Sequence, residues 1–155
     1  TQPAEITSKL ESLLSHVKEL EHELETMRSQ IAKNEVQELM NNVQDINGVK
    51  VVTGQVSAPD MNSLRSVADL VRDRLDCGVV VLGAINSGKV NFVVMATRNA
   101  VAKNIHAGNI VKDVAKIAGG GGGGRPDMAQ AGGKNPDKIS DALKAVTEIV
   151  RSQIK

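Results

Sequence analysis

The chain has 155 residues, of which 41% are hydrophobic and 24% are charged, and its formal net charge is +1. This size and composition fit one domain, or a small domain with an extension, built around a single hydrophobic core. One cysteine and three histidines exclude an internal disulfide framework and a Cys/His zinc cluster, and one Phe with no Trp or Tyr disfavours recognition of bases by aromatic stacking.

The sequence contains no stretch of 18 apolar residues and no basic-then-apolar start typical of a signal peptide. We therefore expect a cytoplasmic protein with no membrane partner. Because the chain begins at Thr1 and not at Met, we also expect it to be a piece of something longer. Charge is divided unevenly: residues 1–47 carry four Lys/Arg and nine Asp/Glu, whereas residues 48–155 carry fifteen and nine. Binding to a polyanion is accordingly expected in the second part.

The first predicted element is a long helix with a coiled-coil seam. Its apolar residues alternate in steps of four and three: Ile6, Leu10, Leu13, Val17, Leu20, Leu24, Met27 and Ile31. Such a stripe needs a partner, which is a second copy, an upstream segment or the chain's own body. We interpret residues 1–47 as a helical subdomain with a dimer seam at Leu10, Leu13, Val17, Leu20 and Leu24. A phase change near Asn34 predicts a kink or restart, and Asn47-Gly48 predicts the helix end.

Residues 48–155 are predicted to form a small globular α/β subdomain. Strands are expected at 49–56, 79–85 and 90–97, with a helix up to Asp76 between the first two. A further helix within 99–118, broken around Gly108, leads to a glycine-rich loop at 119–133 with a short strand at 128–131. Pro136 opens the last amphipathic helix. The predicted fold class is α+β: a long heptad helix followed by a mixed sheet flanked by helices.

Two segments are similar to nucleotide-binding motifs. GAINSGKV, residues 83–90, differs from the P-loop at Val90, where the magnesium-binding hydroxyl should stand, and a strand follows it where the P-loop has a helix. A hairpin turn with a positive φ at Gly88 explains it better. The six glycines from Gly119 to Gly124 also satisfy G-x-G-x-x-G, but no strand precedes them, so we interpret the match as chance.

The glycine run and the cations around it are the best candidate binding site. Bare backbone N–H groups can form an anion-binding nest, and residues 98–138 carry seven Lys/Arg against three Asp. The alternative is a flexible loop beside an ordinary solvated helix face. A third option is a loop packed on the sheet, with Arg125 bound to buried carbonyls. The candidate RNA-binding residues are Arg125, Lys134, Lys103, Lys112, Lys116, Gly121, Gly122, Gly123, Gly124 and Gln130.

Residues suited to catalysis are few and scattered. Cys77 closes a predicted helix and fits a small buried hydrophobe. His16 and His22 belong to the long helix, and His106 stands at a helix start, where it can act as a cap. Asp127 can pair with Arg125 or cap the turn. We therefore predict no catalytic residues, no metal site and no cofactor in this chain.

GGRPDMAQAGG, residues 123–133, resembles a string found in the C-terminal domain of alanyl-tRNA synthetases. The order of the other elements agrees, because a heptad helix and an Asn-Gly break precede the small α/β body. A more distant resemblance is to the small domain that follows the catalytic domain of DHH-type phosphodiesterases, which has its own glycine-rich loop but usually a His. Arg125-Pro126-Asp127 argues against that relative.

The resemblance implies a non-catalytic, tRNA-binding module of a class II aminoacyl-tRNA synthetase. In that family the aminoacylation and editing sites, with their ATP and zinc, lie upstream of this domain. The domain is held to grip the outer corner of tRNA(Ala) and to help one tRNA serve both sites, and the helical part contributes to dimerisation in some members. The alternatives are a dimerisation module that acts through the heptad helix, the tail of a phosphodiesterase, or the tail of a free-standing editing protein.

Overall fold

The structure is a computed structural model that describes residues 3–154. The chain forms two compact units, residues 1–35 and residues 36–155. The predicted α+β class, with a long N-terminal helix followed by a mixed sheet and flanking helices, is confirmed.

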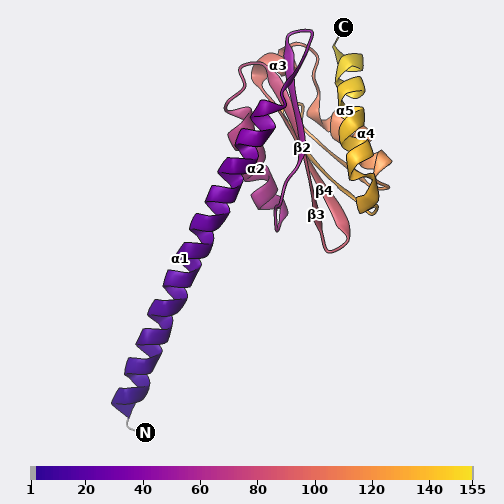
Figure 1. The fold of residues 1–155 in the computed structure, drawn as a ribbon. Helices are drawn as coiled ribbons and strands as arrows, with labels where there is room; N and C mark the ends of the chain where they lie inside the picture. The colour runs from indigo at the N-terminus through magenta and orange to yellow at the C-terminus, as the bar shows by residue number, and fades with distance from the viewer. Residues whose placement is uncertain (1–2, 155) are drawn as a thin grey trace. The chain divides into compact units, whose positions relative to one another are not determined.

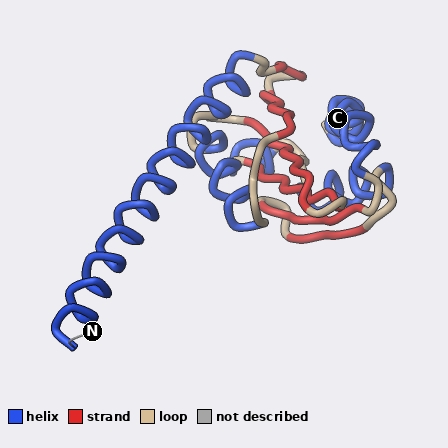
Figure 2. Tube along the Cα trace, turned by 60° about the horizontal axis from the view of Figure 1, so that its bottom comes forward, coloured by secondary structure: helices blue, strands red, loops and turns tan. Residues whose placement is uncertain are grey.

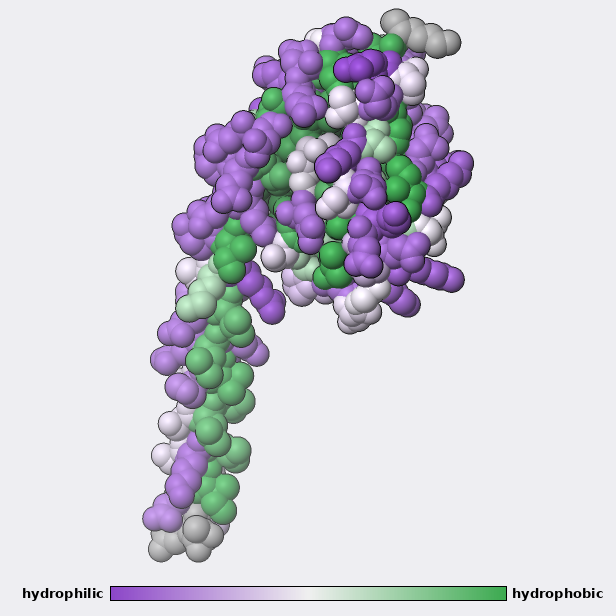
Figure 3. All heavy atoms as spheres, turned by 45° about the vertical axis from the view of Figure 1, so that its right-hand side comes forward, coloured by the Kyte–Doolittle hydropathy of each residue, from purple (hydrophilic) through white to green (hydrophobic). Residues whose placement is uncertain are grey.

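Helix α1 spans Pro3–Asn41 without the restart predicted near Asn34. The eight residues of the predicted seam, from Ile6 to Ile31, are all between 47% and 62% exposed. Figure 3 shows them as a continuous hydrophobic band along the helix. A stripe of this length in contact with water is unusual for a lone helix, since burial of such a stripe supplies most of a helix's stability.

The prediction that Asn47-Gly48 ends the helix is wrong. Helix α1 ends at Asn41, and strands β1 (Gln44–Ile46) and β2 (Val49–Gln55) follow as an antiparallel hairpin. Asn47 and Gly48 form its two-residue turn, with φ of 52° and 88°. Asn-Gly favours this turn because both residues tolerate positive φ. The short strand β1 was missed because three residues show no readable alternation.

Six strands form one sheet in the order β1-β2-β3-β4-β6-β5. The remaining strands are β3 (Gly78–Asn86), β4 (Lys89–Ala96), β5 (Gly121–Gly124) and β6 (Met128–Gly133). Among the strands of residues 3–154, only the β2–β3 pair is parallel. The predicted strands at 49–56, 79–85 and 90–97 are confirmed, and Ser87-Gly88 forms the expected turn, with φ of 51° and 75°.

The helices differ from the predictions mainly at their ends. Helix α2 (Met61–Arg72) ends before the predicted Asp76. The segment 99–118 forms two helices, α3 (Arg98–Ala102) and α4 (Ala107–Ile117), so the break precedes Gly108, which lies in the first turn of α4. Pro136 opens a short 3₁₀ turn (Pro136–Lys138) that continues into α5 (Ile139–Gln153).

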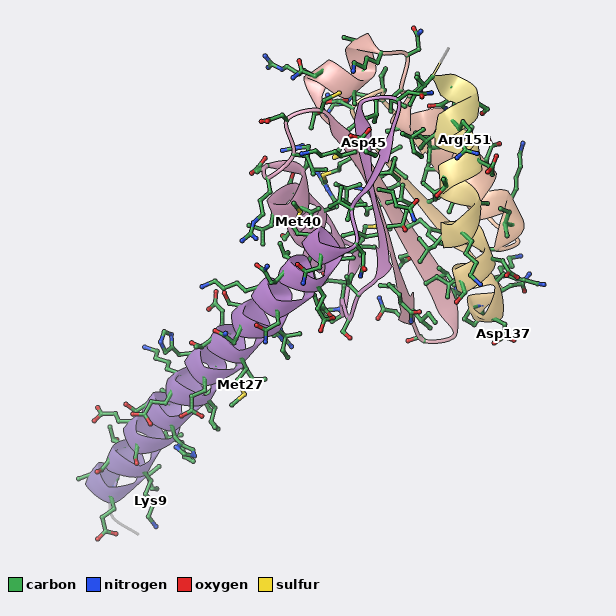
Figure 4. The ribbon with its side chains drawn as sticks, turned by 45° about the horizontal axis from the view of Figure 1, so that its top comes forward. Lys9, Met27, Met40, Asp45, Asp137 and Arg151 are labelled. Atoms are coloured by element: carbon green, nitrogen blue, oxygen red, sulfur yellow. The ribbon has the colours of Figure 1, made fainter. Side chains whose placement is uncertain are left out.

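Helices cover both faces of the sheet (Figures 1 and 2). On one face, α4 and α5 pack against a core that includes Phe92, Val81 and Val94. Asp137 and Arg151 lie near the two ends of this C-terminal helical segment (Figure 4). On the other face, α2 packs against β3 and β4. The last turn of α1 also belongs to this unit, and the Leu39 side chain lies against Gly54.

Candidate nucleic-acid interface

The glycine run starts as the cap of helix α4. Gly119 has φ of 71°, its N–H donates to the Lys116 carbonyl at 3.1 Å, and the Gly120 N–H donates to the Ala115 carbonyl at 2.8 Å. These two bonds form a Schellman motif, which favours glycine at the left-handed position. Of the six consecutive glycines, only Gly119 has a φ in that region. The other five need another explanation.

The expected glycine-rich loop at 119–133 is an antiparallel hairpin of β5 and β6 at one edge of the sheet. A Cβ on Gly120 or Gly122 would overlap the backbone of β6, and one on Gly124 would lie 2.6 Å from the Ala129 Cα. A Cβ on Gly121 would meet nothing within 4 Å. Alternate glycines are therefore required by the close approach of two strands, and Gly121 is not.

The structure contradicts the anion-binding nest predicted for this run. A nest needs successive N–H groups that converge on one point, whereas N–H groups in an extended strand alternate in direction. The pairing of Gly121 to Gly124 with β6 makes the segment a strand. The predictions failed because four consecutive glycines carry no alternation and have low strand propensity. The alternative that Arg125 binds buried carbonyls is also wrong, since its side chain is 73% exposed and lies 3.6 Å from Asp127.

The turn between β5 and β6 is held against the start of helix α4. The Ala107 N–H donates to the Pro126 carbonyl at 2.9 Å, and the Arg125 N–H donates to the Met128 carbonyl at 2.8 Å. Gly108 permits this contact, because a Cβ there would lie 2.8 Å from the Gly124 carbonyl oxygen. The exposed Arg125 side chain is therefore carried by a fixed backbone.

His106 organises the same helix start, as the capping interpretation expected. Its Nδ1 accepts the Asn109 N–H at 3.2 Å, which makes it the N-cap of α4. The His106 N–H donates to Gln153 Oε1 at 3.0 Å, and Gln153 Nε2 donates back to the His106 carbonyl at 3.5 Å. The end of α5 thus fixes the residue that caps α4, next to the β5–β6 turn.

Replacing His106 with Ala should lower the free energy of unfolding by about 1 kcal/mol, because the Asn109 N–H loses its acceptor. His106→Asn keeps a side-chain acceptor at this position and should stay within about 0.5 kcal/mol of the wild type. Urea unfolding followed by circular dichroism measures both values. Equal losses in the two variants would mean that the imidazole acts through packing and not through the cap.

The structure brings only part of the predicted cation set together. Lys112 and Lys116 share the exposed side of α4, and Lys116 lies 3.8 Å from Asp113. Lys112 Cε would lie 3.5 Å from a Cβ on Gly123. Lys134 follows β6, and its N–H donates to the Ala118 carbonyl at 3.0 Å.

Lys103 is separate from this group. Its Nζ lies close to Gly48 in the β1–β2 turn, since a Cβ on Gly48 would be 2.9 Å from it. Strand β1 is at the opposite edge of the sheet from β5. The order of residues along the chain could not reveal this separation. After β4 the chain first forms the edge strand β5 and then returns as β6, which lies between β4 and β5. Which residues become neighbours therefore depends on the order of the strands in the sheet.

On the face of the sheet that carries α2, sequence reasoning named Gly121, Gly123 and Gln130 but missed their neighbours Arg65, Asn91 and Gly132. Paired residues of neighbouring strands share a face, and the register joins Asn91 to Gly132 and Gly132 to Gly121. Gln130 pairs with Gly123 in the next row. At the edge of α2, Arg65 Nη2 lies 3.6 Å from Met128 Sδ. The sequence signal that could have placed part of this set on one face was the spacing of Met128, Gln130 and Gly132 at every second residue.

Residues 3–154 place no three His, Cys, Asp or Glu side chains where they could together hold a metal ion. No helix in the same span has the length and hydrophobicity to cross a membrane. Cys77 is partly buried against the core.

The family described as the DHHA1 domain matches residues 48–152, which include the whole sheet from β2 to β6 and its helices. The C-Ala domain from Aquifex aeolicus alanyl-tRNA synthetase superposes with a TM-score of 0.65 at 32% identity, over 71% of this chain and 98% of that one. The chain is a DHHA1 domain of the C-Ala type.

Longer proteins contain sequences similar to this C-Ala domain. Alanine–tRNA ligase of Pelotomaculum thermopropionicum is 47% identical over 153 residues, and that of Acetivibrio thermocellus is 49% identical over 154 residues. Each match covers 99% of this chain but only 17% and 18% of the ligase. The chain therefore spans less than a fifth of these relatives, and their catalytic parts lie outside it.

Proposed function

We propose that this C-Ala domain binds tRNA in the cytoplasm, grips the outer corner of tRNA(Ala) and helps one tRNA serve aminoacylation and editing sites elsewhere in a longer synthetase. The match to an alanyl-tRNA synthetase C-Ala domain over 98% of its length carries this proposal. The positive charge of residues 48–155 supports it, because phosphate contacts supply most of the affinity of proteins for nucleic acids.

The main contacts are assigned to the exposed cations around the β5–β6 hairpin, which are Arg125, Lys112, Lys116 and Lys134. The same hairpin contains the open backbone of β5 and, on β6, Gln130, which pairs with Gly123. A side-chain-free edge strand lets a sugar–phosphate chain approach the protein more closely than a Cβ would permit. Lys103 is not part of this surface.

The salt dependence of tRNA binding tests this role. With about four phosphate contacts, we expect the affinity for folded tRNA(Ala) to fall with salt at a log–log slope of about −4. A titration with labelled tRNA(Ala), a tRNA of another specificity and a plain hairpin duplex, at several salt concentrations, measures the slope and the preference. Equal affinity for the two tRNAs would place amino-acid identity elsewhere in the synthetase. No binding to any RNA at low salt would refute the proposal.

A second role, self-association through α1, is favoured by one observation, the long exposed stripe of heptad residues. Seven consecutive steps of three and four residues predict a helix partner of matching period. We assign Leu10, Leu13, Val17, Leu20 and Leu24 to this contact.

A further inference from the structure

We infer that the C-Ala domain receives an unpaired RNA nucleotide on the face of its sheet that carries α2. The site is the open sheet floor, defined as Asn91, Gln130, Gly132, Gly121 and Gly123. This inference rests on the proposed RNA-binding function and adds a ligand, a face of the sheet and a set of contacts to it.

The floor is the part of this face where the sheet continues beyond α2. Val93 and Met95 are fully buried, and α2 packs on their strand. On the neighbouring strand β6, which lies nearer the edge of the sheet, Gln130 pairs with Val93 and Met128 pairs with Met95. Both are only partly buried. The row of Asn91, Gly132 and Gly121 then extends the face to the edge strand.

Two amide side chains on this floor lack partners. Asn91 and Gln130 are partly buried, and within residues 3–154 neither side chain makes a hydrogen bond. A Cβ on Gly132 would lie 4.0 Å from Asn91 Oδ1, so the Asn91 amide lies beside the glycine backbone. Each amide offers two donors and one acceptor, which is the complement of the donor and acceptor pattern on a nucleobase edge.

The glycines keep the floor flat. The floor has three positions without side chains, which are Gly121 and Gly123 on β5 and Gly132 on the neighbouring strand β6. A Cβ on Gly121 would meet nothing within 4 Å, and one on Gly132 would meet only ordinary van der Waals contacts at 3.7 and 4.0 Å. Larger residues would therefore fit the fold at these two positions, but they would occupy the space above the floor.

Three cations from three different elements surround this floor. Arg65 comes from α2, Lys89 shares the face of Asn91 by alternation along β4, and Lys112 reaches Gly123 from α4. None of them belongs to an ion pair among the described residues, where Arg72 pairs with Asp69 and Arg125 with Asp127. Unpaired cations around a polar floor suit the phosphates on either side of a bound base.

This chemistry favours RNA over a protein partner. Protein interfaces have apolar, aromatic-rich centres, whereas this floor consists of glycine backbone and two amides. An unpaired nucleotide fits this floor best. In an A-form duplex the deep groove is out of reach of side chains and the shallow groove is recognised mostly by shape and 2′-hydroxyl contacts, whereas loops expose whole base edges. A single-stranded loop or bulge within a folded RNA meets this requirement.

The test uses the whole chain with two RNAs, a stem with an unpaired loop and a blunt duplex of equal length. For Asn91→Ala combined with Gln130→Ala, we expect about a tenfold loss of affinity for the loop RNA and less than a twofold loss for the duplex. For Gly121→Glu, we expect a loss of at least tenfold for the loop RNA. Ser140→Glu, an exposed change of equal charge on α5, should cost less than twofold.

Circular dichroism confirms that each variant is folded before binding is measured. If the double variant does not fold, Gly121→Glu still tests the site. We expect this variant to fold, because a Cβ at this position points into open space. Equal losses of affinity on both RNAs, or equal effects of Gly121→Glu and Ser140→Glu, would overturn the nucleotide site on the open sheet floor. The proposed tRNA-binding function would still stand if the wild type binds tRNA. A wild-type chain that binds no RNA would refute the proposed function itself.

Discussion

Replacing Gly122 with Ala should destabilise the globular unit by at least about 2 kcal/mol and lower its melting temperature by about 8 °C. The new Cβ would overlap Ala131 and the Gln130 carbonyl oxygen in β6. These are backbone atoms and a short side chain, which cannot rotate away. The strand pair must therefore separate or shift, and thermal unfolding followed by circular dichroism measures the cost.

Gly121→Ala is the matched control, one residue earlier in the same strand. Its Cβ would meet nothing within 4 Å, and its φ lies outside the left-handed region. We expect no loss of stability and a gain of up to about 1 kcal/mol, because Ala reduces the entropy of the unfolded chain. Similar melting temperatures for the two variants would show that β5 does not lie close to β6, and would refute the alternation described above.

Leu13→Glu combined with Leu20→Glu should weaken self-association of the whole chain by at least about 100-fold. Each leucine would lose its burial in a helix seam, which is worth about 1.5–3 kcal/mol, and would add a buried charge. Sedimentation equilibrium over a range of concentrations measures the change. Leu13 and Leu20 are 61% and 47% exposed in the single chain, so the substitutions cost little in the monomer.

The control for the seam is Ser15→Glu combined with His22→Glu, on the opposite side of the same helix. Both pairs add two negative charges at pH 7, so general repulsion between chains is the same. We expect the control to associate like the wild type. A monomeric wild-type chain, or equal weakening by the two pairs, would exclude the seam as a homodimer contact and leave another segment of a longer protein as its partner.

The parts of the fold with strong periodic patterns could be predicted from the sequence. The heptad helix and the last helix have apolar residues at helical spacing, and the three long strands are rich in β-branched and apolar residues. All five are confirmed, although the heptad helix ends at Asn41 and not at Asn47-Gly48. Strands β1 and β5 could not be predicted, for different reasons. β1 has only three residues, and the four glycines of β5 have no side chains to alternate.

The candidate site was only partly predictable. Sequence reasoning identified Arg125, Gln130 and the lysines of α4 by their proximity along the chain. It also included Lys103, because strand order cannot be read from residue order, and it missed Arg65, Asn91 and Lys89 for the same reason. These three residues come near β6 only because β6 inserts between β4 and β5.

The position of α5 has a consequence for vectorial synthesis on the ribosome. Val146 and Val150 of α5 enter the same core as Val49 and Val51 of β2, and Thr147 Oγ1 donates to Gln44 Oε1 across 103 residues of chain at 3.1 Å. The first strands therefore emerge about one hundred residues before their covering helix is made. Until then the part of the apolar face formed by β2 and β3 lacks its covering helix, which gives chaperones a defined interval in which to bind it.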